Sequence, residues 1–309
     1  EAYQAIVESA QYDSLSQAGR KVIDNALRDF RLSGIDLPES EQARFSELSR
    51  EISGLNSAFN NNVLDATQVW QKLITEKSGL PGVPHNALAS MYQKAADKEL
   101  QGYLLTLDAP CYLAIVTHCD DRTLRHELYT AFGTRASNLG PNAGEFDNSD
   151  VIHALLSARL EQARLLGFKN YAELSVARKM ARSAEEVLGF LDNLAEKSRT
   201  FARNDFETLV TFAGKNGGPE DLKPWDVPYY AEKLKKAAFD ISEEELRPYF
   251  PAPTVLNGMF EVVRRLFDIE VVASDEMPVW HEDVLTYEIR KGGVSIARFY
   301  FDLYARASK

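Results

Sequence analysis

The stretch FSELSREISGLNSAFNNNV, residues 45–63, sets its large apolar side chains three and four positions apart. These side chains are Phe45, Leu48, Ile52, Leu55, Phe59 and Val63. Steps of three and four bring side chains onto one stripe of an α-helix, and such a stripe is stable in water when another element covers it. The stretch therefore predicts a long helix with a buried stripe.

Other helices are indicated by their ends. Ser183 and Glu186 have the spacing of a capping box, which predicts the start of a second long helix. The apolar positions that follow are Val187, Phe190, Leu191 and Leu194. Ser242 and Glu245 repeat the same spacing. A further helix is predicted from Ile152 to Leu166, with Gly167 as its stop. We expect its inner face to carry Leu155, Leu156 and Leu160.

Clusters of Gly, Pro and Asn predict loops between helices at residues 79–84, 140–148, 214–228 and 248–253. Helical patterns dominate up to about Phe267. Beyond it, β-branched and aromatic residues predict strands at 269–272, 284–289 and 294–301. Gly292 and Gly293 between the last two runs predict a hairpin turn. We therefore expect a mainly α fold, a helical region over 1–268 and the start of a small antiparallel sheet over 269–309.

Composition narrows the class of protein. The 309 residues are 45% hydrophobic, which is enough for a large core, and 35 Lys and Arg against 46 Asp and Glu give a net charge of −11. That charge disfavours nucleic acids and anionic membrane surfaces as partners. The two cysteines are too few for a disulfide framework. The sequence has no apolar run of about 18 residues and no signal peptide at its start, so we expect a cytoplasmic protein. A monomer is favoured as its oligomeric state.

The two ends of the sequence resemble cuts. It starts at Glu1 without Met, in a helical pattern, and stops at Lys309 directly after a strand-like run. We expect this chain to be part of a longer protein.

Zinc-peptidase chemistry requires two His residues one helical turn apart, with a Glu after the first. His126-Glu127 is followed by Thr130 at the fifth position, and His281-Glu282 by Leu285. Neither pair has its second imidazole, so we expect structural roles for both His residues. The sequence thus offers no catalytic and no metal-binding residue, and it leaves the substrate-binding residues unknown.

Other chemistries find no better support. His118 and Cys119 are adjacent, and neighbours on a helix point about 100° apart, so they do not form a catalytic dyad. We interpret Cys111 and Cys119 as small buried residues. The acidic groups at 120–121 and 243–245 fit solvated faces and helix N-termini. No nucleophile elbow and no phosphate-binding glycine loop is present.

Two aromatic clusters leave alternatives open. Trp225, Tyr229 and Tyr230 form the first, for which core packing is favoured over a peptide-binding cleft. For the second cluster, the two interpretations are about equal. It comprises Phe299, Tyr300, Phe301 and Tyr304.

Six segments, in order, resemble the zinc oligopeptidases, the family of oligopeptidase A, thimet oligopeptidase, neurolysin and dipeptidyl carboxypeptidase. They are NALRDFRLSGIDLP from 25, FSELSREISGLNSAFNNNVLDAT from 45, ARLEQARLLGFKNYAELSVARKMA from 158, PWDVPYYAEK from 224, LRPYFPAPTVLNGMFEVVRRLFDIEV from 246 and ARFYFDLYARASK from 297. NNVLDAT, GYLLTLDAP and TRASNLGPNAG point to the oligopeptidase A branch.

The resemblance implies a helical enzyme with two lobes and a channel that admits short unfolded peptides. In the family, the His-Glu-x-x-His helix and a third ligand, a Glu, lie downstream of the segment that matches residues 299–309. We therefore expect Zn²⁺ in the parent protein and none on this chain. The parent is expected to be a zinc metalloendopeptidase that hydrolyses short peptides, including cleaved signal peptides.

This chain alone is expected to be inactive. Its hairpin from Leu285 to Phe301 is a candidate for supporting a peptide-binding sheet edge. The alternative is a non-catalytic helical scaffold that binds peptides or a protein partner.

Overall fold

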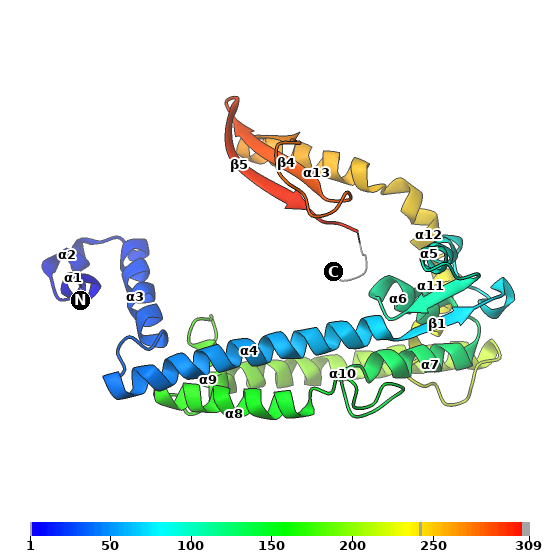
Figure 1. Cartoon of the computed structure of the whole chain (residues 1–309), viewed down its shortest axis with the longest axis horizontal. Coiled ribbons are helices and arrows are strands. Elements are labelled where there is room, and N and C mark those ends of the chain that lie inside the picture. Colours follow the sequence, from blue (N-terminus) through cyan, green and yellow to red (C-terminus); the bar gives the residue numbers. More distant parts are fainter. Residues whose placement is uncertain (1, 241–242, 305–309) are drawn as a thin grey trace. The chain divides into compact units, whose positions relative to one another are not determined.

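The computed structural model describes residues 2–240 and 243–304 (Figure 1). The chain divides into two compact units. Unit 1 comprises Glu1–Ala66 and Thr134–Phe206, and unit 2 comprises Thr67–Gly133 and Glu207–Lys309. Helices predominate in the described residues, which confirms the mainly α class. The expected division into 1–268 and 269–309 stays a prediction. None of the described helices has the length and apolar character to span a membrane.

Unit 1 is built from helices. In chain order they are α1 (Ala2–Val7), α2 (Ala10–Ser14), α3 (Gln17–Leu32), α4 (Glu39–Val69), α8 (Ser149–Leu165), α9 (Tyr171–Val176) and the first part of α10 (Ala184–Lys215). α4 contains the apolar stretch at residues 45–63. Of its six apolar side chains only Leu48 is fully buried, and the other five are half-buried. The helix is therefore as predicted, but its stripe is covered less than we expected.

α4 and α8 run side by side in Figure 1 and are joined by polar contacts along their length. Arg44 Nε donates to Glu161 Oε1 at 2.7 Å near one end. Further along, Gln162 Nε2 donates to Ser49 Oγ at 3.1 Å. At the far end, Asn62 Nδ2 donates to Asn148 Oδ1 at 2.8 Å. These bonds fix which side of α4 faces α8, and they leave its other side less covered.

α8 ends as the sequence predicts. Gly167 adopts a φ of +80°, and the Phe168 N–H donates to the carbonyl of Ala163 at 2.9 Å, which closes the last turn. The expected inner face is wrong at Leu156, which is 59% exposed, whereas Leu155 is buried. Adjacent helical positions diverge by about 100°, so these two leucines cannot both face inward. Leu160 is half-buried.

α10 begins at the predicted capping box. The Glu186 N–H donates to Ser183 Oγ at 3.1 Å, and the Glu186 carboxylate accepts from the Arg182 N–H at 2.6 Å. In a standard capping box the Glu carboxylate accepts from the N–H of the N-cap residue, which here is Ser183. The Glu186 carboxylate accepts from the N–H one residue earlier. The second predicted box contains Ser242 and lies outside the described residues.

Unit 2 has a helical core with a short sheet. Besides the end of α10 and two short 3₁₀ helices, its elements before the C-terminal sheet are β1 (Gln71–Ile74), α5 (His85–Ala96), β2 (Tyr103–Thr106), α6 (Ala109–His118), α7 (Arg122–Gly133), α11 (Val227–Phe239), α12 (Glu243–Leu246) and α13 (Ala252–Phe267). β1 and β2 pair antiparallel, a sheet that the sequence analysis does not predict. Each strand has only four residues, too few for a clear alternating pattern. Met91, Leu105, Ile115 and Leu128 are almost fully buried in this core.

The C-terminal sheet has the order β3-β4-β5, with all pairs antiparallel. Its strands are β3 (Glu270–Ala273), β4 (Leu285–Lys291) and β5 (Val294–Phe301). Lys291 pairs with Val294 across a two-residue turn in which Gly292 and Gly293 have φ of +56° and +80°. Two positive φ values define a type I′ turn, which confirms the predicted hairpin.

Glycine replacement is expected to have opposite effects in α10 and in the hairpin. Gly189 lies within α10, where an added Cβ would meet no atom within 4 Å, so Gly189→Ala should stabilise the chain by about 0.5–1 kcal/mol. Gly293→Ala should destabilise it by about 1–2 kcal/mol because alanine is strained at positive φ. Urea unfolding of both variants checks the signs; equal shifts would contradict the turn geometry.

Candidate functional site

The edge strand of the C-terminal sheet is the candidate peptide-binding element. β5 pairs only with β4, so one of its edges carries no neighbouring strand within the described residues. Val294 and Ile296 on this strand are 65% and 58% exposed. The register shifts between Ile289 and Arg290, which leaves Ile296 without a partner across the pair and forms a β-bulge. An exposed edge of this kind can bind an extended peptide through main-chain hydrogen bonds.

The second aromatic cluster is divided between the two faces of this sheet. Phe299 and Phe301 contact Tyr287, with ring centroids 5.6 and 5.8 Å apart, and Phe260 of α13 lies 4.9 Å from Tyr287. These four rings pack α13 onto one face. Tyr300 instead lies 5.1 Å from Trp280, which is 61% exposed. Tyr304 follows the strand and is 47% exposed. Packing therefore accounts for Phe299 and Phe301, whereas Tyr300 and Tyr304 reach the surface.

A buried carboxylate stabilises the sheet between its two long strands. Glu288 of β4 is 5% exposed and accepts from Arg290, and it also pairs with Arg298 of β5 at 3.6 Å. The hydrogen bond from Arg290 lowers the pKa of Glu288 below its usual value, as does a hydrogen bond from Ser295. Arg298 also donates to Glu276 at 2.8 Å. These charges are paired with one another, so we assign them to holding the hairpin.

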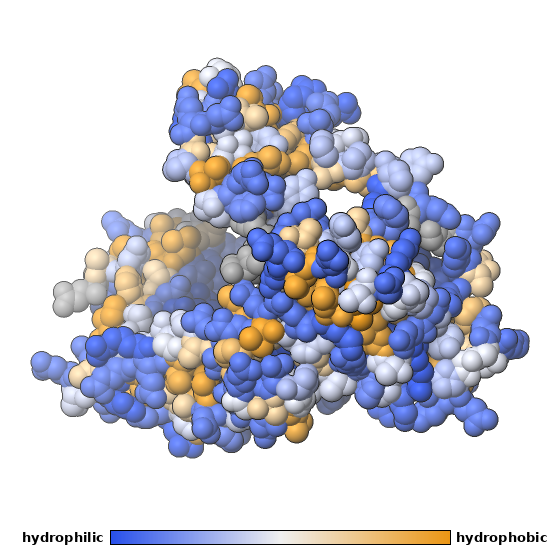
Figure 2. Space-filling view, turned by 45° about the vertical axis from the view of Figure 1, so that its right-hand side comes forward, coloured by the Kyte–Doolittle hydropathy of each residue, from blue (hydrophilic) through white to orange (hydrophobic). Residues whose placement is uncertain are grey.

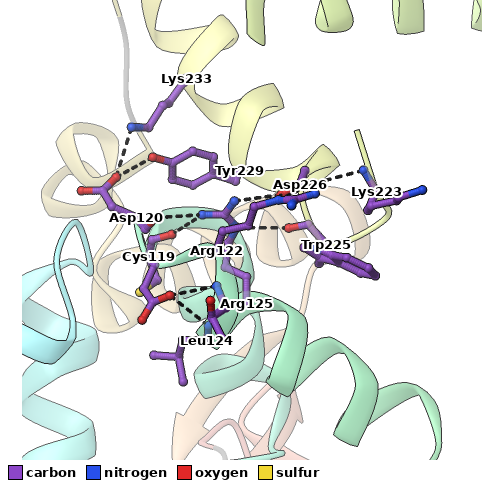
Figure 3. A network of polar contacts seen from close by, with 12 residues as sticks. Cys119, Asp120, Arg122, Leu124, Arg125, Lys223, Trp225, Asp226, Tyr229 and Lys233 are labelled. Atoms are coloured by element: carbon purple, nitrogen blue, oxygen red, sulfur yellow. Dashed lines mark hydrogen bonds and ion pairs between the residues drawn. The ribbon is translucent and has the colours of Figure 1, made fainter. Parts of the chain in front are cut away.

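A polar network of several charged side chains lies around Asp226, before α11 (Figure 3). The carboxylate of Asp226 is fully buried and accepts from Arg122 Nη2 at 2.7 Å and from Arg125 Nη2 at 2.9 Å. It also accepts from the Lys223 N–H at 3.0 Å. Burial alone would raise the pKa of Asp226, but the hydrogen bonds from Arg122, the Lys223 N–H and Arg125 outweigh it and lower that pKa. Asp226 is therefore a carboxylate at neutral pH.

Arg125 is the most buried cation of this network. Its side chain is 2% exposed, and its other donors bind the carbonyls of Cys119 at 2.8 Å and Trp225 at 3.2 Å. The guanidinium also lies 4.0 Å from the centre of the Tyr229 ring, a cation–π distance. Its charge and hydrogen-bonding groups are thus satisfied. This network ties the start of α7 to the loop before α11.

A second carboxylate lies at the exposed side of the network. Asp120 Oδ1 accepts from the Tyr229 hydroxyl at 2.6 Å and from Lys233 Nζ at 3.1 Å (Figure 3). The hydrogen bond from Tyr229 is the main reason that the pKa of Asp120 lies below its usual range. Burial and the bond to Asp120 raise the pKa of Tyr229. The phenol is thus protonated at neutral pH and acts as a hydrogen-bond donor.

These contacts predict acid sensitivity. A carboxyl group whose pKa is lower in the folded chain stabilises the fold above its unfolded pKa, about 3.9, and that contribution is lost as pH falls through the folded value. The free energy of unfolding should therefore fall below about pH 4. Asp120→Asn should remove this contribution, so the variant should be less stable than the parent chain at neutral pH, and the difference should vanish as pH falls through the folded pKa. Urea unfolding at a series of pH values measures both slopes; identical slopes would contradict the role of Asp120.

The two predicted His-Glu pairs are far from the geometry of a zinc site. The His126 ring lies against Trp225 with centroids 4.0 Å apart and the ring planes tilted by 37°, and Glu127 pairs with Lys72 at 2.5 Å. His281 Nδ1 accepts from the Asp283 N–H at 3.2 Å. Over residues 2–240 and 243–304, no three His, Cys, Asp or Glu side chains are grouped to hold a metal ion. These residues do not fit a zinc ion.

Neither thiol is placed for nucleophilic chemistry. Cys111 and Cys119 are buried, and burial raises the pKa of both thiols. Cys111 and His118 line a cavity of about 560 Å³ along α5 and α6, whose other walls are mostly apolar or uncharged. Glu232 and Arg247 are its charged lining residues. The cavity thus has no thiolate.

The network around Asp226 was not predicted from the sequence, because nothing near Asp226 in the chain indicates its partners. Asp226 precedes α11 and suggests a helix cap, but its side chain makes no capping bond and binds arginines about one hundred residues earlier. One signal was present: Arg122 and Arg125 are three positions apart, which places them on one face of α7. Asp121 does cap α7, as its place at a helix N-terminus predicts, because its Oδ1 accepts from the Thr123 N–H at 2.8 Å. The first aromatic cluster agrees with core packing, since Tyr229 and Tyr230 are buried.

Comparison with known proteins identifies the family. The sequence profile of Peptidase family M3 matches residues 115–309. The chain is 46% identical to "Oligopeptidase A" of Escherichia coli (strain K12) over 309 residues, which is 100% of this chain and 45% of that protein. It is 40% identical to "Probable cytosolic oligopeptidase A" of Arabidopsis thaliana, with 100% of this chain and 45% of that protein covered. Escherichia coli "Dipeptidyl carboxypeptidase" is 32% identical over 91% of this chain and 41% of its own length.

The chain therefore belongs to Peptidase family M3. It spans about 45% of the length of the oligopeptidase A relatives that it matches.

Proposed function

We propose that this chain forms part of a zinc metalloendopeptidase that hydrolyses short peptides, including cleaved signal peptides, in the cytoplasm. Membership of Peptidase family M3 and the oligopeptidase names of its relatives support a peptidase. In such an enzyme zinc would polarise the scissile carbonyl and activate a water molecule. Because no described residues fit the metal, we propose that the chain by itself binds no catalytic zinc and is inactive.

The part of this chain that meets the substrate is proposed to be the edge of β5. The observation that carries the proposal is an exposed eight-residue edge strand, Val294–Phe301, whose inner side is anchored through β4. An extended peptide could add to this edge as a further strand, and Tyr300 and Trp280 offer aromatic surface beside it. Amide exchange in a full-length relative, with and without a peptide inhibitor, tests this role. Slower exchange in the aligned strand is expected, and unchanged exchange would remove the strand from the site.

The catalytic part of the proposal is tested with a quenched fluorescent peptide. The chain extended by its downstream coding sequence should cleave the peptide, and a chelator should abolish cleavage. The 309-residue chain should show no cleavage. Chelator-sensitive cleavage by the 309-residue chain would contradict the proposal, and absence of cleavage by the extended chain would favour a non-catalytic scaffold.

A further inference from the structure

α10 carries an apolar stripe that no described element covers. Every residue from 188 to 208 is exposed, and burial in this helix begins only at Leu209. Phe190, Leu194 and Phe201 are 67%, 53% and 72% exposed. Their steps of four and seven positions place them on one side of the helix. Figure 2 shows orange apolar areas between hydrophilic ones on one face of the molecule.

A stripe of this kind is costly in water. Burial of these side chains would be favourable, and large exposed apolar patches on proteins usually mark an interaction surface. A helix of 32 residues also depends on packing of its apolar face for most of its stability. The exposed stripe of α10 therefore has the character of an interaction surface.

Charge is segregated along the same helix. Residues 184–196 contain four acidic and no basic side chains, whereas residues 197–203 contain three basic and no acidic ones. In the part of the chain that the structure describes, Asp192, Glu196, Arg199 and Arg203 form no ion pair. The partner surface should thus be apolar opposite Leu194 and Phe201, basic opposite the first segment and acidic opposite the second.

We propose that the α10 stripe is the docking surface for the part of the family M3 fold that lies outside the length spanned by this chain. All of this chain aligns with about 45% of the relatives, so more than half of each relative remains to supply the opposing surface. Family membership carries this inference, which is independent of the proposed activity. A chain that shows no zinc or peptide binding can still have this docking surface.

The decisive experiment places the same substitutions in two proteins. Leu194→Gln with Phe201→Gln should leave the thermal midpoint of this chain unchanged, because both side chains are already exposed and glutamine is a good helix former. The aligned double substitution in full-length Escherichia coli oligopeptidase A should lower its midpoint by several degrees or prevent folding. Leu209→Gln, in the buried part of α10, should destabilise both proteins and serves as the matched control. An unchanged midpoint of the relative would overturn the proposal.

A second measurement needs no substitution. Hydroxyl-radical footprinting should modify the side chains of residues 190–201 readily in this chain and much less at the aligned positions of the relative. Equal modification of the two proteins would overturn the docking surface. Light scattering tests whether a second copy of this chain covers the stripe instead. Self-association that grows with concentration and is lost in the double variant would overturn the assignment to the rest of the fold.

Discussion

Asp226→Ala is expected to lower the free energy of unfolding by about 3–5 kcal/mol. The substitution leaves Arg125, whose side chain is 2% exposed, with a buried positive charge and no carboxylate partner. Removing one member of a buried ion pair costs far more than the pair contributes, because the remaining charge can reach neither water nor a partner. Asp226→Asn keeps the shape and one acceptor, so its cost should be smaller than that of alanine.

The matched control for Asp226 lies five residues earlier. Asp221 is 76% exposed and pairs with Lys223 Nζ at 2.5 Å, so Asp221→Ala should cost less than about 1 kcal/mol. Denaturant unfolding followed by tryptophan fluorescence reports on this region because Trp225 adjoins the network. Similar losses for the two alanine variants would mean that Asp226 does not compensate the buried charge of Arg125.

Leu48→Ala is expected to destabilise unit 1 by about 2–5 kcal/mol. Leu48 is the one fully buried apolar side chain of the stretch at residues 45–63, with 0% exposure. Truncation would remove its apolar contacts and leave a cavity that rigid neighbouring helices cannot fill. Helical circular dichroism during urea unfolding measures the loss.

The control for Leu48 is Leu64→Ala in the same helix. Leu64 is 37% exposed, so its truncation leaves no closed cavity and should cost about 0.5 kcal/mol. Because both variants exchange leucine for alanine in α4, any gain in helix propensity is the same for each. Equal losses would show that the position of Leu48 between the helices is not what stabilises this unit.

Local patterns in the sequence were sufficient for most elements of the fold. The spacing of apolar side chains predicted α4, the Ser183 and Glu186 pair predicted the start of α10, and Gly167 predicted the end of α8. The glycine pair at 292–293 predicted the type I′ hairpin. Each of these features depends on residues within a few positions of one another, so chain geometry alone determines it.

Exposure followed the local pattern less closely. Leu156 was expected on the inner face of α8 and is exposed, and five of the six apolar side chains at 45–63 are only half-buried. Periodicity tells which side chains share a face, but the neighbouring helix determines how much of that face is covered. The four-residue strands β1 and β2 were missed because each is too short to show a period.

What the sequence alone determined about this protein is its helical class, its C-terminal hairpin and its resemblance to the M3 peptidases, together with the failure of both His-Glu pairs to form the zinc motif. Only the tertiary structure decided that Asp226 binds Arg122 and Arg125, that Asp120 binds Tyr229 and that the aromatic residues of β5 divide between two faces. The polar pairs join side chains about one hundred positions apart, and these side chains meet only when whole helices pack together. The two faces of a strand become distinct only when a helix covers one of them.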